Sequence, residues 1–530
     1  MRFFRWLLGA ILVVVLIAAS FQTLQYFGVW GNLTESQVRS LDEGDQEIAL
    51  IEPATSTDDW ARLYTAIKLL ETDWLLLNPA LPRLHVADDA FPALTSDVPE
   101  ITLWLGPAPN GRLRLRWYKI TGEHSSDSWV GKLQKRGRPP LAIIGGATSD
   151  RAVKLGRALQ AAYPDPAQPS PVFLITTATA DRTGKDEPLV ELYAKRTFRY
   201  SFTNHAMVEA LLRFVKQNPN VWTRQPAEPD KAGHTMHTVV WQDERYSQDL
   251  AELFRAEFRK FYPEGRHFEV GRIRYSVGDF FHPSPLEQAA VDTFLADHAP
   301  IAPHSLLVLP TQTTCMRRFL MNLRQRDPQD TRNLVILNGD ALSFNSVYRD
   351  RDVVWNILDL PFSVVFFCHR NPIERAAGFT WIKEDAVEGK PSYTQKSTTG
   401  TNDVLLYTDL VASLLYAAHD DGRLTTDFTA LPEKLRATTW QEPLPGTKDA
   451  AVVRQPRPHA DQVGKRPFFD EHGNRSPFTG EHIVWVKPNF ADDRVEQTST
   501  ISVWTVRPNE MAGAWQLVEA PHNVAYNQNR

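Results

Sequence analysis

Cysteine is scarce in this sequence of 530 residues, because only Cys315 and Cys368 are present. So few cysteines exclude a scaffold held together by disulfides, and the lack of a Cys-x-x-Cys pair argues against a cysteine zinc site. We expect two buried thiols. An oxidising compartment would also allow one bridge between them, although the sequence gives no distance on which to decide.

The sequence also lacks an excess of positive charge. Its 58 Lys and Arg residues face 63 Asp and Glu residues, which gives a net charge of −5 and a pI near 6.3. No broad basic field is available for nucleic acid, so we predict no nucleic-acid partner. A charged fraction of 23% and a hydrophobic fraction of 42% are typical of globular proteins. The length predicts two or three folded units.

Catalytic and metal-binding motifs are missing as well. The sequence contains no Gly-x-Ser-x-Gly elbow, no phosphate-binding Walker loop, no His-Glu-x-x-His and no Gly-x-Gly-x-x-Gly. The 15 histidines are scattered along the chain. We therefore predict no enzyme activity, no catalytic residue, no metal site and no cofactor.

One long apolar run is present at the N-terminus. Arg2 and Arg5 precede it, and no charged residue occurs from Trp6 to Thr34. Because roughly 20 apolar residues span a bilayer, we predict a membrane anchor within residues 1–30. A cleaved signal peptide and a buried core helix are the alternatives. Either an anchor or a signal peptide would place residues 31–530 outside the cytoplasm.

Residues 141–162, LAIIGGATSDRAVKLGRALQAA, are the most informative stretch of the chain. Leu141 to Ile144 is an apolar run that ends in two glycines, which indicates a buried strand. A helix follows, and Thr148 or Ser149 can cap its first turn. A strand that leads into a helix N-terminus presents unpaired N–H groups to an anion. The pattern is typical of a binding edge.

Strands and helices alternate through the rest of the chain, which predicts parallel α/β sheets with right-handed crossovers. Strands are expected at 101–105, 113–120, 171–175, 198–202, 238–242, 305–309, 333–337 and 363–367, and in the tail at 482–486, 500–506 and 515–519. Helices are expected at 204–216, 247–261, 286–297, 314–325 and 407–419, with another that begins near Asp58. The arginines of 113–120 are expected to face solvent. Residues 262–285 and 370–401 are expected to be irregular.

Several segments resemble the type 1 periplasmic binding proteins, which include the branched-chain amino-acid and amide-binding components of ABC transporters and the ligand-binding regions of receptors. The segments are IIGGATS (143–149), FLITTATAD (173–181), FRYSF (198–202), VVWQDERYSQDLAELF (239–254), YTDLVASLLYAA (407–418) and FFDEHGNR (468–475). The chain departs from the family in its greater length and in Tyr246-Ser247, where Tyr-Gly is usual. The resemblance implies two α/β lobes that are joined by crossovers and close on a ligand at the strand C-termini.

The resemblance also implies a set of ligand-binding residues in the first lobe. Residues that match Thr148 and Ser149 bind a ligand carboxylate in the family, and a helix N-terminus favours negative charge. Simple helix capping is the alternative for both. Thr177 and Thr179 would face the same ligand from the neighbouring strand, or would cap the helix that follows.

Two further residues are implied for the second lobe. Tyr246 would cover the ligand, because its ring is apolar and its hydroxyl is polar; packing at a helix start is the alternative. Asp340 would pair with an amino group of the ligand, and an Asx turn at the strand end is the alternative.

The predicted organisation follows from these segments. It comprises an anchor or signal peptide (1–30), lobe 1 (31–205), lobe 2 (206–368), a hinge and return segment to lobe 1 (369–440), a surface insertion (441–467) and the C-terminal part of lobe 2 (468–530). We predict an extracytoplasmic solute-binding protein with a small amino-acid or amide-like ligand. Its other partners would be the membrane and a permease or sensor. An envelope interaction protein that keeps the fold without a ligand is the alternative.

Overall fold

A computed structural model describes most of the chain. The described residues are 38–77, 82–87, 98–106, 111–183, 187–222, 233–274, 283–297, 304–326, 334–342, 362–368, 379–387, 390–397, 402–420, 423–424, 428–440, 456–457, 469–474, 482–489, 498–508 and 515–527. The predicted anchor (1–30) and most of the predicted insertion (441–467) lie outside them. No helix within the described ranges combines the length and apolar character that a membrane crossing requires.

Seven strands form the first sheet, in the order β2-β3-β4-β1-β5-β6-β7. Their bounds are β1 (Gln46–Pro53), β2 (Leu84–Val86), β3 (Glu100–Leu105), β4 (Leu113–Ile120), β5 (Ala142–Gly145), β6 (Val172–Ile175) and β7 (Thr197–Arg199). Strands β4, β1, β5, β6 and β7 are parallel, whereas β3 and β2 extend the sheet antiparallel at one edge. Strand β1 is therefore central in this sheet.

Helices cover both faces of the first sheet. On one face, α2 (Thr57–Leu77), α10 (Asn402–Ala418) and α11 (Leu431–Arg436) share an apolar core with alternate strand residues. On the other face, α3 (Ser126–Lys135), α4 (Ser149–Ala162) and the 3-10 helix η2 (Leu189–Tyr193) form a second core. This three-layer arrangement buries nearly continuous apolar strands such as β5 and β6 on both sides.

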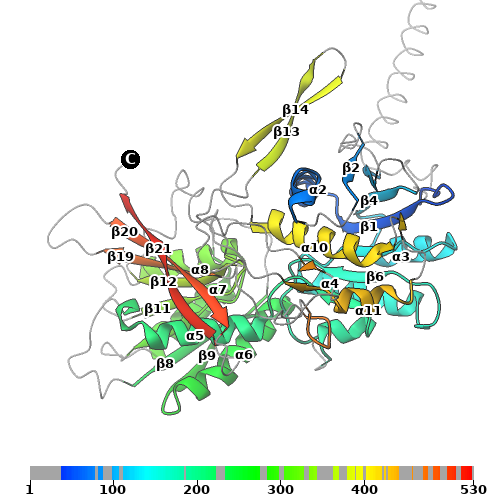
Figure 1. The fold of residues 1–530 in the computed structure, drawn as a ribbon. Coiled ribbons are helices and arrows are strands. Elements are labelled where there is room, and N and C mark those ends of the chain that lie inside the picture. Colours follow the sequence, from blue (N-terminus) through cyan, green and yellow to red (C-terminus); the bar gives the residue numbers. More distant parts are fainter. Residues whose placement is uncertain are drawn as a thin grey trace, which may run out of the picture.

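Eight strands form the second sheet, in the order β21-β20-β19-β12-β11-β10-β8-β9. Their bounds are β8 (Thr235–Trp241), β9 (Arg266–Ile273), β10 (Ser305–Val308), β11 (Leu334–Leu337), β12 (Ser363–Cys368), β19 (His482–Asn489), β20 (Thr498–Pro508) and β21 (Trp515–Asn527). The first five of these are parallel, and the tail strands β19, β20 and β21 add antiparallel. The two sheets lie in separate halves of the molecule (Figure 1).

The second sheet is also covered on both faces. Helices α7 (Pro285–Asp297) and α8 (Thr313–Arg326) pack on one face, and α5 (Asn204–Gln217) and α6 (Arg245–Phe261) pack on the other. Both Cys315 and Cys368 are buried and free, as the sequence led us to expect. Shorter pieces complete the described chain: η3 (Pro219–Val221) and the two-stranded pairs β13 (Phe379–Val387) with β14 (Lys390–Ser397), β15 (His419–Asp420) with β16 (Arg423–Leu424), and β17 (Thr439–Trp440) with β18 (Pro456–Arg457).

The chain passes between the two halves more than once. After β7 it enters α5, which packs on the second sheet. It later returns through α10, which packs against α2 of the first half. A further return brings Phe469 against the rings of Phe198 and Tyr200 before the chain re-enters the second sheet as β19. These crossings make two lobes from a discontinuous chain.

Four expectations about individual elements were wrong. Strand β1 was not expected, although it is central, and residues 262–285 contain strand β9. Residues 379–397 form the hairpin of β13 and β14 rather than a loop. The β4 arginines do not face solvent: Arg114 Nε lies 2.7 Å from Asp45 Oδ2, and Arg116, which is only 5% exposed, lies 2.7 Å from Glu100 Oε2. Ion pairing allows these charges to be buried.

Candidate functional site

The turn between β5 and α4 lies at the carboxyl edge of the first sheet. Gly146 has a φ of +78°, and a Cβ at this position would lie 2.9 Å from the Cβ of Ala152, so glycine is required for the tight passage into the helix. Helix α4 begins at Ser149. Thr148 caps it, because its hydroxyl accepts a hydrogen bond from Arg151 N at 3.4 Å. The helix start is therefore fixed against the edge of the sheet.

The other first-lobe candidates gather around this helix start. The Ser149 hydroxyl accepts a hydrogen bond from Ala180 N at 3.2 Å, and the Thr177 hydroxyl donates one to Ala147 O at 2.9 Å. Thr179 is buried, and its carbonyl accepts from Arg199 Nη1 at 3.1 Å. The structure thus brings the four predicted residues together, with the Thr148, Ser149 and Thr177 hydroxyls bonded within their own lobe.

Glu52 also belongs to this edge, although sequence reasoning missed it. Its Oε1 accepts a hydrogen bond from Ala147 N at 2.9 Å, and its Oε2 lies 3.4 Å from Arg151 Nη1. Burial raises the pKa of this carboxyl group to about 7, against the lowering effects of Ala147 and Arg151. The carboxyl group binds an N–H group just before α4, where a ligand carboxylate was expected. Because strand β1 was itself not predicted, the sequence offered no signal for Glu52.

Tyr246 and Asp340 lie together in the second lobe. The Tyr246 hydroxyl accepts a hydrogen bond from Ala341 N at 3.2 Å. Burial and the neighbouring Asp340 carboxyl group hold the pKa of Tyr246 well above its usual value. A Cβ at Gly339 would lie 2.3 Å from the Tyr246 hydroxyl, so glycine is needed for the ring to reach this loop. Tyr246 therefore fixes the loop after β11 rather than standing free.

Glu244 is the second carboxyl group that the sequence did not indicate. It precedes α6 at the carboxyl end of β8, and Thr311 Oγ1 donates to its Oε2 at 3.3 Å. Burial raises the pKa of Glu244 to about 7, and the nearby Asp150 of the first lobe contributes. Glu52 thus lies near the end of β1 and Glu244 follows β8, and burial raises the pKa of each carboxyl group to about 7.

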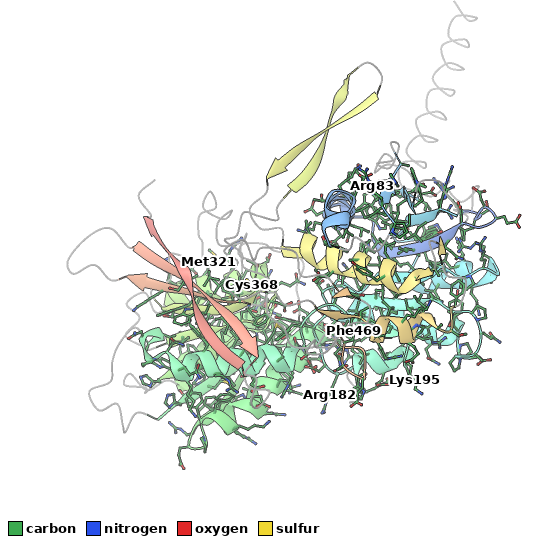
Figure 2. The ribbon with its side chains drawn as sticks, viewed as in Figure 1. Arg83, Arg182, Lys195, Met321, Cys368 and Phe469 are labelled. Carbon is green, nitrogen blue, oxygen red and sulfur yellow. The ribbon has the colours of Figure 1, made fainter. Side chains whose placement is uncertain are left out.

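Hydrogen bonds join the two lobes beside these carboxyl groups. Arg245 N, at the start of α6, donates to Asp150 Oδ2 in the first turn of α4 at 3.2 Å. The Asp249 carboxylate accepts from Asp181 N at 2.8 Å and from Arg182 N at 3.3 Å. Figure 2 shows Arg182 where the two lobes meet.

The Asp249 carboxylate also accepts from the side chain of Asn204 at 2.7 Å. Burial, followed by the charge of Asp181, raises the pKa of Asp249 to about 6. The strand ends of the two lobes therefore face each other across direct polar contacts. Within the described residues, no group of three or more His, Cys, Asp or Glu side chains is arranged to hold a metal ion.

Several solved structures share this architecture. A closed-conformation leucine-, isoleucine-, valine-, threonine- and alanine-binding protein from Brucella ovis superposes with a TM-score of 0.50 at 10% identity, over 91% of this chain and 95% of that chain. The chain has the type 1 periplasmic binding protein fold. The predicted fold is thereby confirmed for the two α/β lobes.

Two other solved structures are similar at lower scores. A leucine-binding protein from Thermotoga maritima matches with a TM-score of 0.47 at 12% identity, over 89% of this chain and 97% of that chain. A solute-binding protein from R. palustris in complex with benzoate matches with a TM-score of 0.46 at 11% identity, over 91% and 98%. No protein-family model and no curated protein matches the sequence.

Proposed function

We propose that this chain is an extracytoplasmic solute-binding protein that holds a small polar ligand between its two lobes. One observation carries the proposal: the loops after β5 and β8 meet through the bond between Arg245 N and Asp150 Oδ2 at 3.2 Å. Ligands of open α/β sheets bind at the carboxyl ends of the strands. The type 1 binding protein fold is consistent with this location.

The acidic groups at this edge support an amino-acid or amide-like ligand. Glu244 and Asp340 would accept hydrogen bonds from an amino or amide group, with Tyr246 as a wall from the second lobe and Thr148, Ser149, Thr177 and Thr179 facing it from the first lobe. The proposed partners are the membrane, through residues 1–30, and a permease or sensor. The division into lobes at 31–205 and 206–368 is part of the same proposal, which includes no catalytic step.

The ligand is the first quantity to measure. Native mass spectrometry of the purified chain would detect a co-purified solute, and thermal shift would then compare amino acids with their amides. A ligand at 100 times its dissociation constant should stabilise the protein by about 2.7 kcal/mol. A specific mass or a reproducible shift would support solute binding. The absence of both across the panel would contradict it.

Substitutions then locate the ligand. Glu244→Gln and Asp340→Asn should each weaken the binding of an amino-bearing ligand about tenfold or more, because a hydrogen bond to a charged group contributes about 1.5–3 kcal/mol. Glu264→Gln is the matched control, since Glu264 is an exposed acid beyond the end of α6. Titration calorimetry would give the affinities. Equal affinity in all three variants would place the ligand elsewhere.

A specific observation favours the alternative of an envelope interaction protein that keeps the fold without a ligand. Ala147 N is bonded to Glu52, and the Ser149 and Thr177 hydroxyls are bonded within the first lobe. A ligand would have to replace these bonds or use other groups. Failure of every solute in the thermal-shift panel, together with capture of one envelope protein by the intact chain, would favour this second function.

A further inference from the structure

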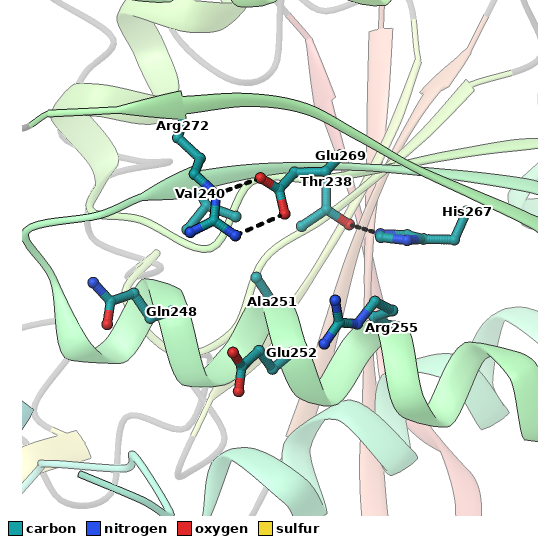
Figure 3. Close-up of a pocket in the computed structure, with 9 residues that line it drawn as sticks. All are labelled: Thr238, Val240, Gln248, Ala251, Glu252, Arg255, His267, Glu269 and Arg272. Carbon is teal, nitrogen blue, oxygen red and sulfur yellow. Dashed lines mark hydrogen bonds and ion pairs between the residues drawn. The ribbon is translucent and has the colours of Figure 1, made fainter. Parts of the chain in front are cut away.

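A polar cavity lies in the second lobe, away from the contact between the lobes. It has a volume of about 160 Å³ and lies between helix α6 and strands β8 and β9. Strand β9 is the edge strand of the sheet. Figure 3 shows Arg255 and His267 together at one end of the cavity, with Gln248 and Arg272 toward the other. None of these side chains belongs to the proposed interlobe site.

A β-bulge gives the cavity its side chains. Thr238 pairs with Glu269, but the next residue, Val239, pairs with Gly271, so Val270 is an extra residue in β9. Side chains alternate along a strand, and the extra residue therefore turns Arg272 onto the same face as Glu269. Two bonds confirm this placement: Arg272 Nε lies 2.6 Å from Glu269 Oε1, and Nη2 lies 3.2 Å from Oε2.

The cavity also carries two carboxylates. Glu269 is paired with Arg272 through two bonds, and it acts on His267 as well. Glu252 lies three residues before Arg255 on α6, and Figure 3 shows the two side chains side by side. An anion bound at Arg255 must therefore be held despite the neighbouring charge of Glu252.

The other end carries positive charge without a partner. Among the residues that the structure describes, neither Arg255 nor Arg259 makes a hydrogen bond or an ion pair. The two arginines lie one turn apart on α6. Burial lowers the pKa of His267, and the charges of Arg255 and Arg259 lower it further, whereas Glu269 raises it slightly. His267 Nε2 lies 3.1 Å from the hydroxyl of Thr238, which is 1% exposed. Donors of three kinds thus converge here.

We propose that this end of the cavity binds a small oxyanion, with the Arg255 guanidinium as its main contact and His267 and Thr238 as orienting groups. Guanidinium groups bind carboxylates and phosphates through paired N–H donors, and the exposed Arg255 can present such donors. The volume of about 160 Å³ suits one small anion. Arg259, one turn along α6 from Arg255, acts on His267 and adds attraction at longer range. The site is independent of ligand binding between the lobes.

The test uses the purified full-length chain and three probes: inorganic phosphate, sulfate and acetate. Titration calorimetry of the unmodified chain should detect binding of at least one probe, and Arg255→Gln should weaken it about tenfold or more. Arg255→Lys should weaken binding less than Arg255→Gln does, because lysine keeps the positive charge but lacks the paired N–H donors of the guanidinium group. Arg157→Gln is the matched control: Arg157 is an exposed arginine that lines another cavity, between α3 and α4, and its loss should leave affinity unchanged.

A second measurement separates the site from nonspecific attraction. The imidazole resonances of His267 should shift on titration with the bound probe and should not shift in Arg255→Gln. Tighter binding of phosphate and sulfate than of acetate would identify a phosphate-type ligand. Tighter binding of acetate would identify a carboxylate ligand. Absence of binding for all three probes, or equal loss in Arg157→Gln, would overturn the proposal. Neither result would affect the interlobe assay, which uses other ligands and residues.

Discussion

The carboxyl group of Glu52 shows how one residue sets the chemistry of the interlobe edge. It lies near the end of the central strand of the first sheet and accepts a hydrogen bond from Ala147 N at 2.9 Å. An N–H group beside a helix start is normally available to an anion from outside the protein. In this chain the Glu52 carboxyl group already accepts the hydrogen bond of this N–H group. A ligand carboxylate would therefore have to displace Glu52 to bind there.

Glu52 should make stability dependent on pH. Its pKa is about 7 in the folded chain, raised from 4.5 mainly by burial. The folded state therefore binds more protons than the unfolded state between these values, and stability falls as pH rises from 4.5 to 7. Glu52→Gln should keep the acceptor for Ala147 N and remove this loss. The variant should be more stable than the unmodified chain at pH 8, by up to about 3 kcal/mol, with little difference at pH 5.

Urea unfolding at the two pH values measures this effect. Glu264→Gln, which removes an exposed acid, is the control and should follow the unmodified chain at both values. If Glu52→Gln showed the same pH dependence as the unmodified chain, the raised pKa would be wrong.

Strand β1 shows how an element can be central and still be missed. Its sequence QEIALIEP contains three polar or charged residues within eight, so it lacks the apolar run that marks β5 or β6. Its charges are nevertheless buried through distant partners. Glu47 is 0% exposed and accepts a hydrogen bond from the Tyr118 hydroxyl at 2.5 Å, with Arg136 beside it. No local pattern contains these partners.

Helix α6 connects the two lobes at its first turns. The Asp249 carboxylate accepts three hydrogen bonds, from Asp181 N, Arg182 N and Asn204 Nδ2. A buried carboxylate that satisfies three donors is costly to replace, because the donors are left unpaired. The relative position of the lobes depends on this contact and on the bond between Arg245 N and Asp150.

Asp249→Asn should loosen the lobes. The amide has only one acceptor oxygen, so at least one donor loses its partner and stability should fall by about 1–3 kcal/mol. Cleavage after Arg182 by trypsin should become faster, which limited proteolysis would measure. Asp127→Asn, an exposed acid of α3, is the control. Unchanged cleavage and unchanged melting temperature in Asp249→Asn would contradict a role in joining the lobes.

At the scale of the whole molecule, strands and helices between Val38 and Val506 supply the four apolar clusters of the described residues. If residues 1–30 are a separable anchor, as the sequence predicts, their removal should leave both lobes folded and should give a protein that stays in solution without detergent. Size-exclusion chromatography and circular dichroism would measure this. A longer deletion through Pro53 removes the central strand β1 and should not fold. Aggregation of the shorter deletion under every condition would contradict a separable N-terminal segment.

Local patterns were sufficient for much of the fold. Apolar runs bounded by glycine and polar residues located β5, β6, β10, β11 and β12, and helical spacing located α5, α6, α7, α8 and α10 to within a few residues. The apolar face of each of these elements is formed by residues that are close together in the sequence. The hydrophobic period and the length of the segment therefore predict the element. The order of such segments was also sufficient to indicate two α/β lobes.

Long-range contacts decided the rest. The central position of β1, the burial of Arg116 and the role of Glu52 each depend on a partner more than ten residues away, which no window of sequence displays. The same holds for the contact of Asp249 with Asp181 and for the bulge that turns Arg272 toward α6. A buried charge is stable only when a specific partner reaches it, and that partner is brought there by the tertiary fold.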